Sequence, residues 1–425
     1  FMSKIDICIS IIQTIKDYLF STEKLKKHHE KKHFSRKRKL SLFQVIIFLI
    51  YSSKASMNIN ISHIRDELPI VFPNVSKQAV SKARQHIKPS LFKDFFDISV
   101  SIFYSNLPSR KTWNSYHIFA VDGSKLELPN SKSNFEHFGK MFTTVYKKVY
   151  TMALASMIYD VLEDYIVHAS IDEYLASERA AAREHLASLK KLNIHKNSIV
   201  IFDRGYYSKD FFRFCSAAGF LCLIRLQEGF NFAKSCTGDN TFTLFGDQKQ
   251  NILDIPIRII RVTLDNGTEE YLATNITDTK ITQSMFKELY FLRWPVETKY
   301  RELKISLLIE EFTGATKVSI IQEFFITMLL SNISSLIKKE ADEKIADTAD
   351  ESNKYEYQAN RNFIIGAIVI NLPKILCNVF EVSKINSIYI EAIRCKSQIQ
   401  PNRSFPRRKN KMRCQKHYGN KKTTR

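Results

Sequence analysis

Glycine is absent from the first 110 residues, and the whole chain of 425 residues has only 11 glycines and 10 prolines. A segment without glycine favours helix, and its only prolines are at 69, 73, 89 and 108, so we expect 1–110 to be helical throughout. Cysteine is also sparse. The seven cysteines are an odd number and form no CxxC pair, which argues against a disulfide framework and a structural zinc site.

Long apolar runs are missing as well. A membrane span needs roughly 18 apolar residues, and the longest candidate, 320–337, is interrupted by Glu323 and Asn332. The first residues have no apolar signal-peptide segment. With 44% apolar and 25% charged residues, which is typical of folded domains, we expect a cytoplasmic protein without a membrane partner.

Positive charge is concentrated at the two ends of the chain. Residues 1–110 hold 19 Lys and Arg against 8 Asp and Glu, and 401–425 hold 10 against none. Residues 111–400 are balanced, so the ends carry the whole net charge of +21. Two basic arms around a neutral middle favour binding of a polyanion, most often nucleic acid. Solvated charge without a partner is the alternative.

A short amphipathic helix is predicted over 77–87, with Ser76 as its N-cap. Its apolar stripe consists of Val80, Ala83 and Ile87. The outward face carries Lys77, Gln78, Ser81, Lys82 and Gln85. Such a face is typical of the reading helix of a helix-turn-helix, although other surface helices share the pattern. We therefore expect Lys77, Gln78 and Lys82 to contact DNA.

The periodicity changes to that of strands after residue 110. Apolar runs predict strands over 117–121, 149–159, 161–171, 198–202 and 220–226, and helices over 175–192 and 209–218. This order predicts a mixed α/β sheet and not an all-parallel one. We divide the chain into a helical DNA-binding region (1–110), a catalytic domain (111–314) with a β-rich insertion at about 227–280, a helical C-terminal region (315–400) and a basic tail (401–425) that is disordered without a partner.

Two aspartates share one local context. Asp122 and Asp203 each end an apolar strand, and each is followed within two residues by glycine. Side chains at strand ends converge on the crevice where α/β proteins place their chemistry. Two carboxylates are costly to bury together unless a divalent cation is present, and hard oxygen ligands suit Mg²⁺ or Mn²⁺. The alternative is a turn or cap role for each aspartate.

A third carboxylate lies on a helix that we expect over 290–304. At 100° per residue, its polar side chains share a sector of about 80°: Tyr290, Arg293, Glu297, Arg301 and Lys304. A separate apolar stripe comprises Val296, Tyr300, Leu303 and Leu307. One carboxylate among cations suits a metal ligand with phosphate contacts, whereas a solvated face is the alternative. Pro295 leaves open a kink or a helix start at this point.

These residues resemble a known family. The spacing Tyr290-x2-Arg293-x3-Glu297-x6-Lys304 is similar to the Y-(2)-R-(3)-E-(6)-K signature of the transposases of IS4-type insertion sequences, and Asp122-Gly and Asp203-Arg-Gly resemble the two aspartate blocks of that family. The resemblance covers about 35–340 and implies a ribonuclease-H-like catalytic domain with a β-rich insertion.

The resemblance also implies roles for single residues. Asp122, Asp203 and Glu297 become the DDE ligands of two Mg²⁺ or Mn²⁺ ions. Tyr290, Arg293 and Lys304 become contacts to transposon-end DNA, with Arg301 as a further one. One departure exists: relatives use an insertion tryptophan to hold a flipped base during hairpin formation, whereas this chain has tryptophan only at 113 and 294. Phe230, Phe232 or Tyr271 could substitute.

The implied activity is cut-and-paste DNA transposition. The protein would bind the double-stranded terminal inverted repeats of its element, cut them, and join the 3′ ends to target DNA, as a dimer in the synaptic complex on the bacterial nucleoid. Two alternatives stay open. One is a nuclease of the same fold without strand transfer, and the other is a DNA-binding protein whose catalytic site has decayed.

Overall fold

The computed structural model describes the chain except for residues 1, 36–38, 52–53, 108, 144–147, 228, 251, 265–266, 351–353 and 401–425. The predicted basic tail, 401–425, therefore lies outside the described residues.

The N-terminal region is helical, as predicted. Its helices are α1 Lys4–Phe20, α2 Thr22–Lys26, α3 Leu42–Tyr51, α4 Met57–Glu67, α5 Lys77–Arg84 and α6 Ser90–Asn106. The helix predicted after Ser76 is α5, and the Ser76 hydroxyl accepts a hydrogen bond from the backbone N–H of Ala79 as an N-cap. The helix is amphipathic, with Val80 fully buried and Lys77 exposed.

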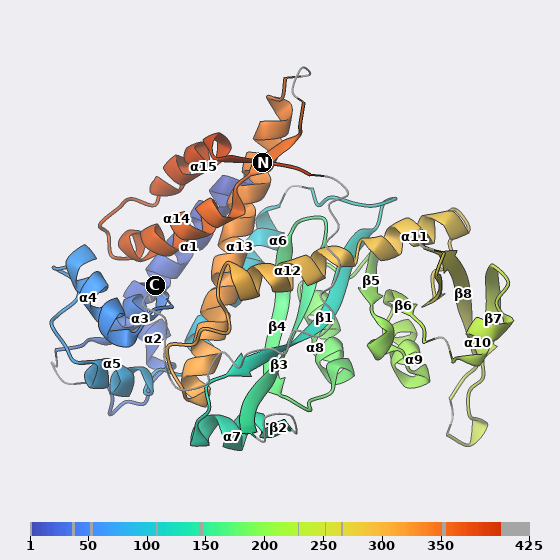
Figure 1. Ribbon diagram of the computed structural model, residues 1–425, viewed down its shortest axis with the longest axis horizontal. Coiled ribbons are helices and arrows are strands. Elements are labelled where there is room, and N and C mark those ends of the chain that lie inside the picture. The colour runs from blue at the N-terminus through green and yellow to red at the C-terminus, as the bar shows by residue number, and fades with distance from the viewer. Residues whose placement is uncertain are drawn as a thin grey trace.

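A mixed sheet forms the centre of the molecule (Figure 1). Strand β1 (His117–Leu128) pairs antiparallel with β3 (Lys148–Asp160) and parallel with β5 (Ser198–Phe202). Strand β4 (Tyr165–Glu173) adds antiparallel to β3, and β6 (Leu221–Arg225) adds parallel to β5. The order β4-β3-β1-β5-β6 is that of a ribonuclease-H-like sheet, which confirms the predicted fold class.

The β-rich insertion extends this sheet at one edge. Strand β9 (Glu269–Thr274) pairs antiparallel with β6, and β8 (Ile255–Thr263) and β7 (Asp239–Leu244) follow outward. In Figure 1 these strands lie at the opposite end of the molecule from the N-terminal helices. The short β2 (Met141–Thr143) pairs with β3 at the other side. The remaining elements of the region are α7 Lys132–Phe138, α8 Glu178–Lys191, η1 Arg204–Tyr206, α9 Lys209–Ala217, α10 Asn231–Ser235, η2 Gln248–Gln250, α11 Gln283–Phe291 and α12 Trp294–Ile305.

The C-terminal region is helical too, and it packs beside the N-terminal helices. It contains α13 Lys317–Asp347, α14 Arg361–Leu376 and α15 Lys384–Arg394, with the small β10 Tyr357–Ala359 paired to β11 Lys396–Gln398. Helix α13 is long and apolar enough to cross a membrane by length and composition, but 94% of its apolar window is buried inside the protein. It is the central helix of the fold, in contact with α1, α6, α14, α15 and β4 (Figure 1).

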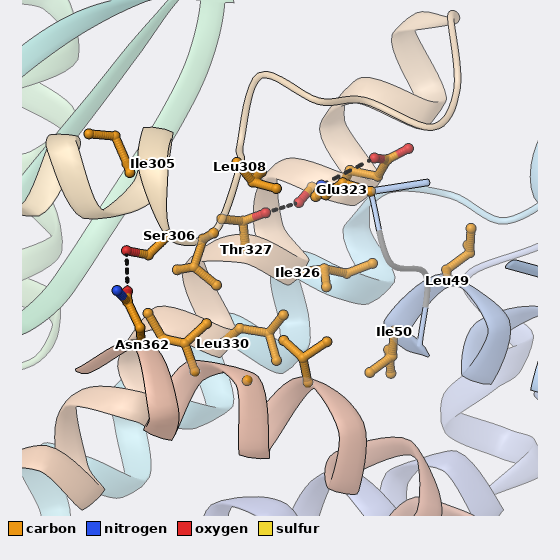
Figure 2. Close-up of a pocket in the computed structure, with 15 residues that line it drawn as sticks. Leu49, Ile50, Ile305, Ser306, Leu308, Glu323, Ile326, Thr327, Leu330 and Asn362 are labelled. Carbon is orange, nitrogen blue, oxygen red and sulfur yellow. Dashed lines mark hydrogen bonds and ion pairs between the residues drawn. The ribbon is translucent and has the colours of Figure 1, made fainter. Parts of the chain in front are cut away.

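A buried ion pair joins α5 to α13. Arg84 is fully buried, and its Nη2 lies 3.2 Å from Oε1 of Glu323. Glu323 also accepts hydrogen bonds from Thr313 and lies 3.5 Å from Nζ of Lys54. Figure 2 shows Glu323 at the rim of an apolar cavity of about 410 Å³, where α3, the end of α12, α13 and α14 meet. The N-terminal and central helices are therefore connected by charge as well as by apolar packing.

Candidate active site

The two predicted aspartates lie side by side on the central strands, but not in equivalent positions. Asp203 follows the last residue of β5, as expected. Asp122 does not end its strand: β1 continues to Leu128, because it stays paired with β3 there, and Asp122 lies opposite Met157. Only the parallel pairing with β5 stops before Asp122, at Val121 opposite Phe202. Both aspartates thus lie just past the shared parallel ladder.

The segment carrying the third carboxylate is two helices, so the possibility of a helix start at Pro295, which the sequence left open beside a kink, is the one found. Tyr290 lies in α11, and Arg293 is the N-cap of α12, with Pro295 in its first turn. Proline is accepted there because the first N–H groups of a helix have no intrahelical partner. Glu297 then falls in the first turn of α12, where the positive end of the helix dipole favours a carboxylate.

Helix α12 is held across the sheet at the level of Asp122. The buried Tyr300 hydroxyl donates toward the backbone carbonyls of Asp122 and Ala155, at 3.0 and 3.1 Å. The predicted apolar stripe is buried, with Val296 and Leu303 fully so. This docking brings Glu297 to the edge where the aspartates lie.

Two side chains from the helical break contact the acidic residues. Nη2 of Arg293 lies 2.7 Å from Oε1 of Glu297, and the Tyr290 hydroxyl donates to Oδ1 of Asp203 at 3.2 Å. Arg293 is 4% exposed and Tyr290 is 5% exposed. Burial raises the pKa of Tyr290 to about 12, so the phenol keeps its proton. Burial alone would lower the pKa of Arg293, but Tyr290, Glu297 and Asp203 raise it, so the guanidinium stays charged.

The carboxyl of Asp122 lies in a largely buried and negatively charged environment. Its pKa is raised to about 7, mainly by burial and also by the charges of Glu297 and Asp203, while Arg293 and the Gly123 N–H act in the opposite direction. A carboxyl that titrates near neutrality beside two others marks a site where negative charge is crowded.

The donor set suits a hard divalent cation, because it consists of carboxylate oxygens. In the described residues, however, no three His, Cys, Asp or Glu side chains are close enough together to hold one ion. Arg293 donates a hydrogen bond from Nη2 to Oε1 of Glu297, and its Nε is buried without a hydrogen-bond partner. The chemistry of the residues fits the metal, and the guanidinium stands among the carboxylates as the counter-charge.

A family model described as the transposase DDE domain matches residues 113–333. The chain belongs to the DDE transposase family. The matched segment runs from just before β1 into α13, so it contains Asp122, Asp203 and Glu297 in chain order. A curated relative, the transposase InsG for insertion sequence element IS4 of Escherichia coli (strain K12), is 22% identical over 298 residues, which are 66% of each chain. These matches confirm the resemblance to IS4-type transposases.

A solved structure is also similar to this DDE transposase chain. It is the cryo-EM structure of the piggyBac transposase synaptic complex with hairpin DNA. The TM-score is 0.47 at 9% identity, and the alignment covers 90% of this chain and 84% of that chain.

The other two predicted DNA-contacting cations of α12 differ in exposure. Arg301 is exposed, and its Nη2 donates a hydrogen bond to the Thr298 hydroxyl at 3.1 Å. Lys304 is half-buried: its Nζ donates to the carbonyl of Lys125 at 2.9 Å and lies 3.8 Å from Glu310. Arg301 faces solvent, whereas Lys304 is tethered to β1.

The back of α12 carries an ionic cluster that the sequence patterns did not reveal. Lys299, 2% exposed, lies 2.7 Å from Asp164 and 3.2 Å from Glu302. Arg361 of α14 closes the cluster, at 3.0 Å from Asp164 and 2.6 Å from Glu302. The sequence did contain a sign of this cluster: Lys299 lies three residues after Val296, so helical spacing places its charge on the buried stripe. The cluster anchors α12 from the side opposite Glu297.

The predicted DNA-reading residues lie far from this edge, on α5. Lys77, Gln78 and Lys82 are all exposed. Lys82 lines a hollow of about 540 Å³, together with Lys32, His33, Lys39 and His86 among others, and none of the lining residues is acidic. The rings of His33 and His86 stack with centroids 3.5 Å apart. Arg84, although on the same helix, is buried and belongs to the ion pair with Glu323.

The insertion aromatics proposed to hold a base have different surroundings. Phe230 packs edge-on against Tyr207, with ring centroids 4.8 Å apart. Tyr271 is half-buried within β9. The side chain of Phe232 lies outside the described residues.

Proposed function

We propose that this protein is a cut-and-paste DNA transposase, which binds the ends of its element, cleaves them and joins the 3′ ends to target DNA. The observation that carries the proposal is the convergence of Asp122, Asp203 and Glu297 at one edge of the sheet, in chain order within the family match. Buried Arg293 and Tyr290 contact two of these carboxylates.

In this proposal Asp122, Asp203 and Glu297 hold two Mg²⁺ or Mn²⁺ ions. Such a pair supplies an activated water or 3′-hydroxyl and stabilises the leaving oxygen. Glu297 would hold a metal in place of its bond to Arg293, and the guanidinium would then be available to bind a phosphate of the cleaved strand. Tyr290, with its proton retained, donates to phosphate and does not act as a nucleophile. Lys304 and Arg301 fix the register of the DNA backbone.

The N-terminal region would recognise the element ends. Lys77, Gln78 and Lys82 on α5 face solvent, and the basic hollow beside them suits DNA phosphates. The tail 401–425 would add nonspecific attraction through its ten basic side chains. We extend the proposal to a dimer in the synaptic complex, because the two ends of the element must be held together. We also propose that the protein acts in the bacterial cytoplasm, on the nucleoid.

The test uses a supercoiled plasmid that carries the two element ends, incubated with the full chain and Mg²⁺. Excision and joined products support transposition. Nicking without joining supports a nuclease of the same fold. Binding without any cleavage supports a decayed catalytic site. A matched plasmid without the ends controls for nonspecific nicking.

A further inference from the structure

Two glycines beside the catalytic aspartates surround one further carboxylate. Gly123 follows Asp122, and Gly205 lies two residues after Asp203. A Cβ atom on Gly123 would lie 3.1 Å from Oε1 of Glu178, and a Cβ atom on Gly205 would lie 3.7 Å from Oε2 of the same side chain. The carboxylate of Glu178 therefore lies between the two backbones that carry the aspartates.

Backbone conformation does not require glycine at either position. Positive φ angles occur at other glycines in the described part of the chain, 139, 219 and 267, and not at Gly123 or Gly205. Gly123 continues β1 in register with Ser156. A Cβ atom at Gly123 would sit tightly against Glu178, so the absence of a side chain there provides room for the carboxylate.

Local structure directs Glu178 to this place. It is the first residue of α8, after the N-cap Ser177, whose hydroxyl accepts from the N–H of Ala180. The helix packs on β1, β3 and η1, the elements that bear or follow the aspartates. Burial, then the charges of Asp122 and Glu178, raise the pKa of the Tyr206 hydroxyl, so both carboxylates act on the same buried ring.

The Glu178 carboxylate has no hydrogen bond or ion pair among the described residues. The guanidinium of Arg293, which lowers the pKa of Asp122, is bonded to Glu297. A fourth carboxylate added to the crowded set is unfavourable in the metal-free protein, because like charges at close range resist ionising together. Divalent cations reverse the sign of this effect, since every carboxylate then adds to their attraction.

We propose that Glu178 is a fourth carboxylate of the metal site, acting with Asp122 and Asp203. This inference rests on the proposed function, because it presupposes that the DDE residues bind metal. Glu178 would hold a cation through its bound water, because no three such carboxylates of the described residues are close enough to share one ion directly. The two glycines keep the path between α8 and the aspartates open.

The experiment measures Mn²⁺ binding to the full chain, with free Mn²⁺ followed by electron paramagnetic resonance. The variants are Glu178→Gln, Glu178→Ala and the reference Asp122→Asn. The matched control is Glu184→Gln, an exposed glutamate on the same helix. Thermal melts of each variant verify folding. We expect both Glu178 variants to weaken Mn²⁺ binding about 10- to 100-fold, Asp122→Asn to weaken it at least as much, and Glu184→Gln to leave it unchanged.

The outcomes separate the two proposals. If Asp122→Asn loses Mn²⁺ while both Glu178 variants bind it as the wild type does, the role of Glu178 is wrong and the metal site stands. If Asp122→Asn binds Mn²⁺ like the wild type, the proposed metal site fails and Glu178 fails with it. A parallel Mg²⁺ titration of plasmid cleavage should show a rise in the half-maximal Mg²⁺ concentration for Glu178→Gln, with cleavage recovered at high Mg²⁺.

Discussion

Nη2 of Arg293 lies 2.7 Å from Oε1 of Glu297, one helical turn away, with the guanidinium almost wholly buried. The carboxylates of Glu297, Asp122 and Asp203 lie at the same edge of the sheet and would repel one another. The buried guanidinium of Arg293 offsets part of this negative charge. The relationship explains how these carboxylates coexist at one edge of the sheet, and it predicts that Arg293 contributes to stability.

Arg293→Ala should therefore reduce the free energy of unfolding by about 1–3 kcal/mol, because it removes a buried hydrogen-bonding group and leaves the acidic edge without its cation. Arg301→Ala, at an exposed position of the same helix, should change it by less than about 0.5 kcal/mol. Urea unfolding of both variants measures the difference. Equal stability losses would mean that the two arginines do not differ in the way their burial indicates.

Neutralising the carboxylates should separate binding from cleavage. Asp122→Asn, Asp203→Asn and Glu297→Gln should each abolish cleavage of the element ends in Mg²⁺, because each removes a proposed metal ligand. Binding of the same DNA should persist, since its free energy comes mainly from cations. Gel-shift and plasmid-cleavage assays on the same preparations provide the comparison. Near-normal cleavage by any one variant removes that residue from the ligand set.

The Arg84–Glu323 pair should make stability depend on pH. Burial alone would raise the pKa of Glu323, but Lys54, Arg84 and the Thr313 bonds lower it to about 2. A carboxyl with a lowered pKa stabilises the fold above its unfolded pKa of about 4.5, and this contribution is lost as pH falls toward 2. The contribution is on the order of 3 kcal/mol.

Urea unfolding of the wild type and Glu323→Gln between pH 7 and pH 3 tests this. The stability difference between them should be largest near pH 7 and shrink below pH 4.5. Glu136→Gln, at an exposed position on α7, serves as the control and should show no such convergence. A constant difference across the range would contradict the lowered pKa.

The ionic cluster behind α12 should be intolerant of losing one partner. Arg361→Met leaves Asp164 and Glu302 with one fewer cation in a buried place, and we expect a loss of about 3–5 kcal/mol. Leu303→Ala, in the neighbouring apolar stripe, should cost about 2–5 kcal/mol by opening a cavity. Thermal unfolding measures both. Arg361→Met melting with the wild type would show that the cluster does not anchor the helix.

DNA binding should divide between the two basic ends. Deleting 401–425 should weaken binding equally for element ends and random duplexes, and flatten the salt dependence, since each phosphate contact contributes roughly 0.9 to the slope of log affinity against log salt. Replacing Lys77, Gln78 and Lys82 by Ala should instead erase the preference for element ends. Salt titrations with both duplexes distinguish these effects. Selective loss of the preference on tail deletion would place the reading residues in the tail.

Several features of this protein follow from sequence alone, because they depend on short-range order. The absence of glycine and the cap at Ser76 predict α5, and apolar runs predict the strands of the sheet. The spacing of Tyr290, Arg293, Glu297 and Lys304 identifies the family, since a signature depends only on residue type and separation.

Only the tertiary structure decided what those residues contact. The sequence left open a kink or a helix start at Pro295, and the fold has a helix start there. It predicted a strand ending at Asp122, but the pairing with β3 continues β1 beyond that residue. The ion pair of Arg84 with Glu323 joins residues 239 positions apart. The position of Glu178 between Gly123 and Gly205 requires α8, β1 and η1 to be packed together. Local patterns carry no information on such distant pairs, because burial of a charge becomes favourable only when its partner is brought to it by the fold.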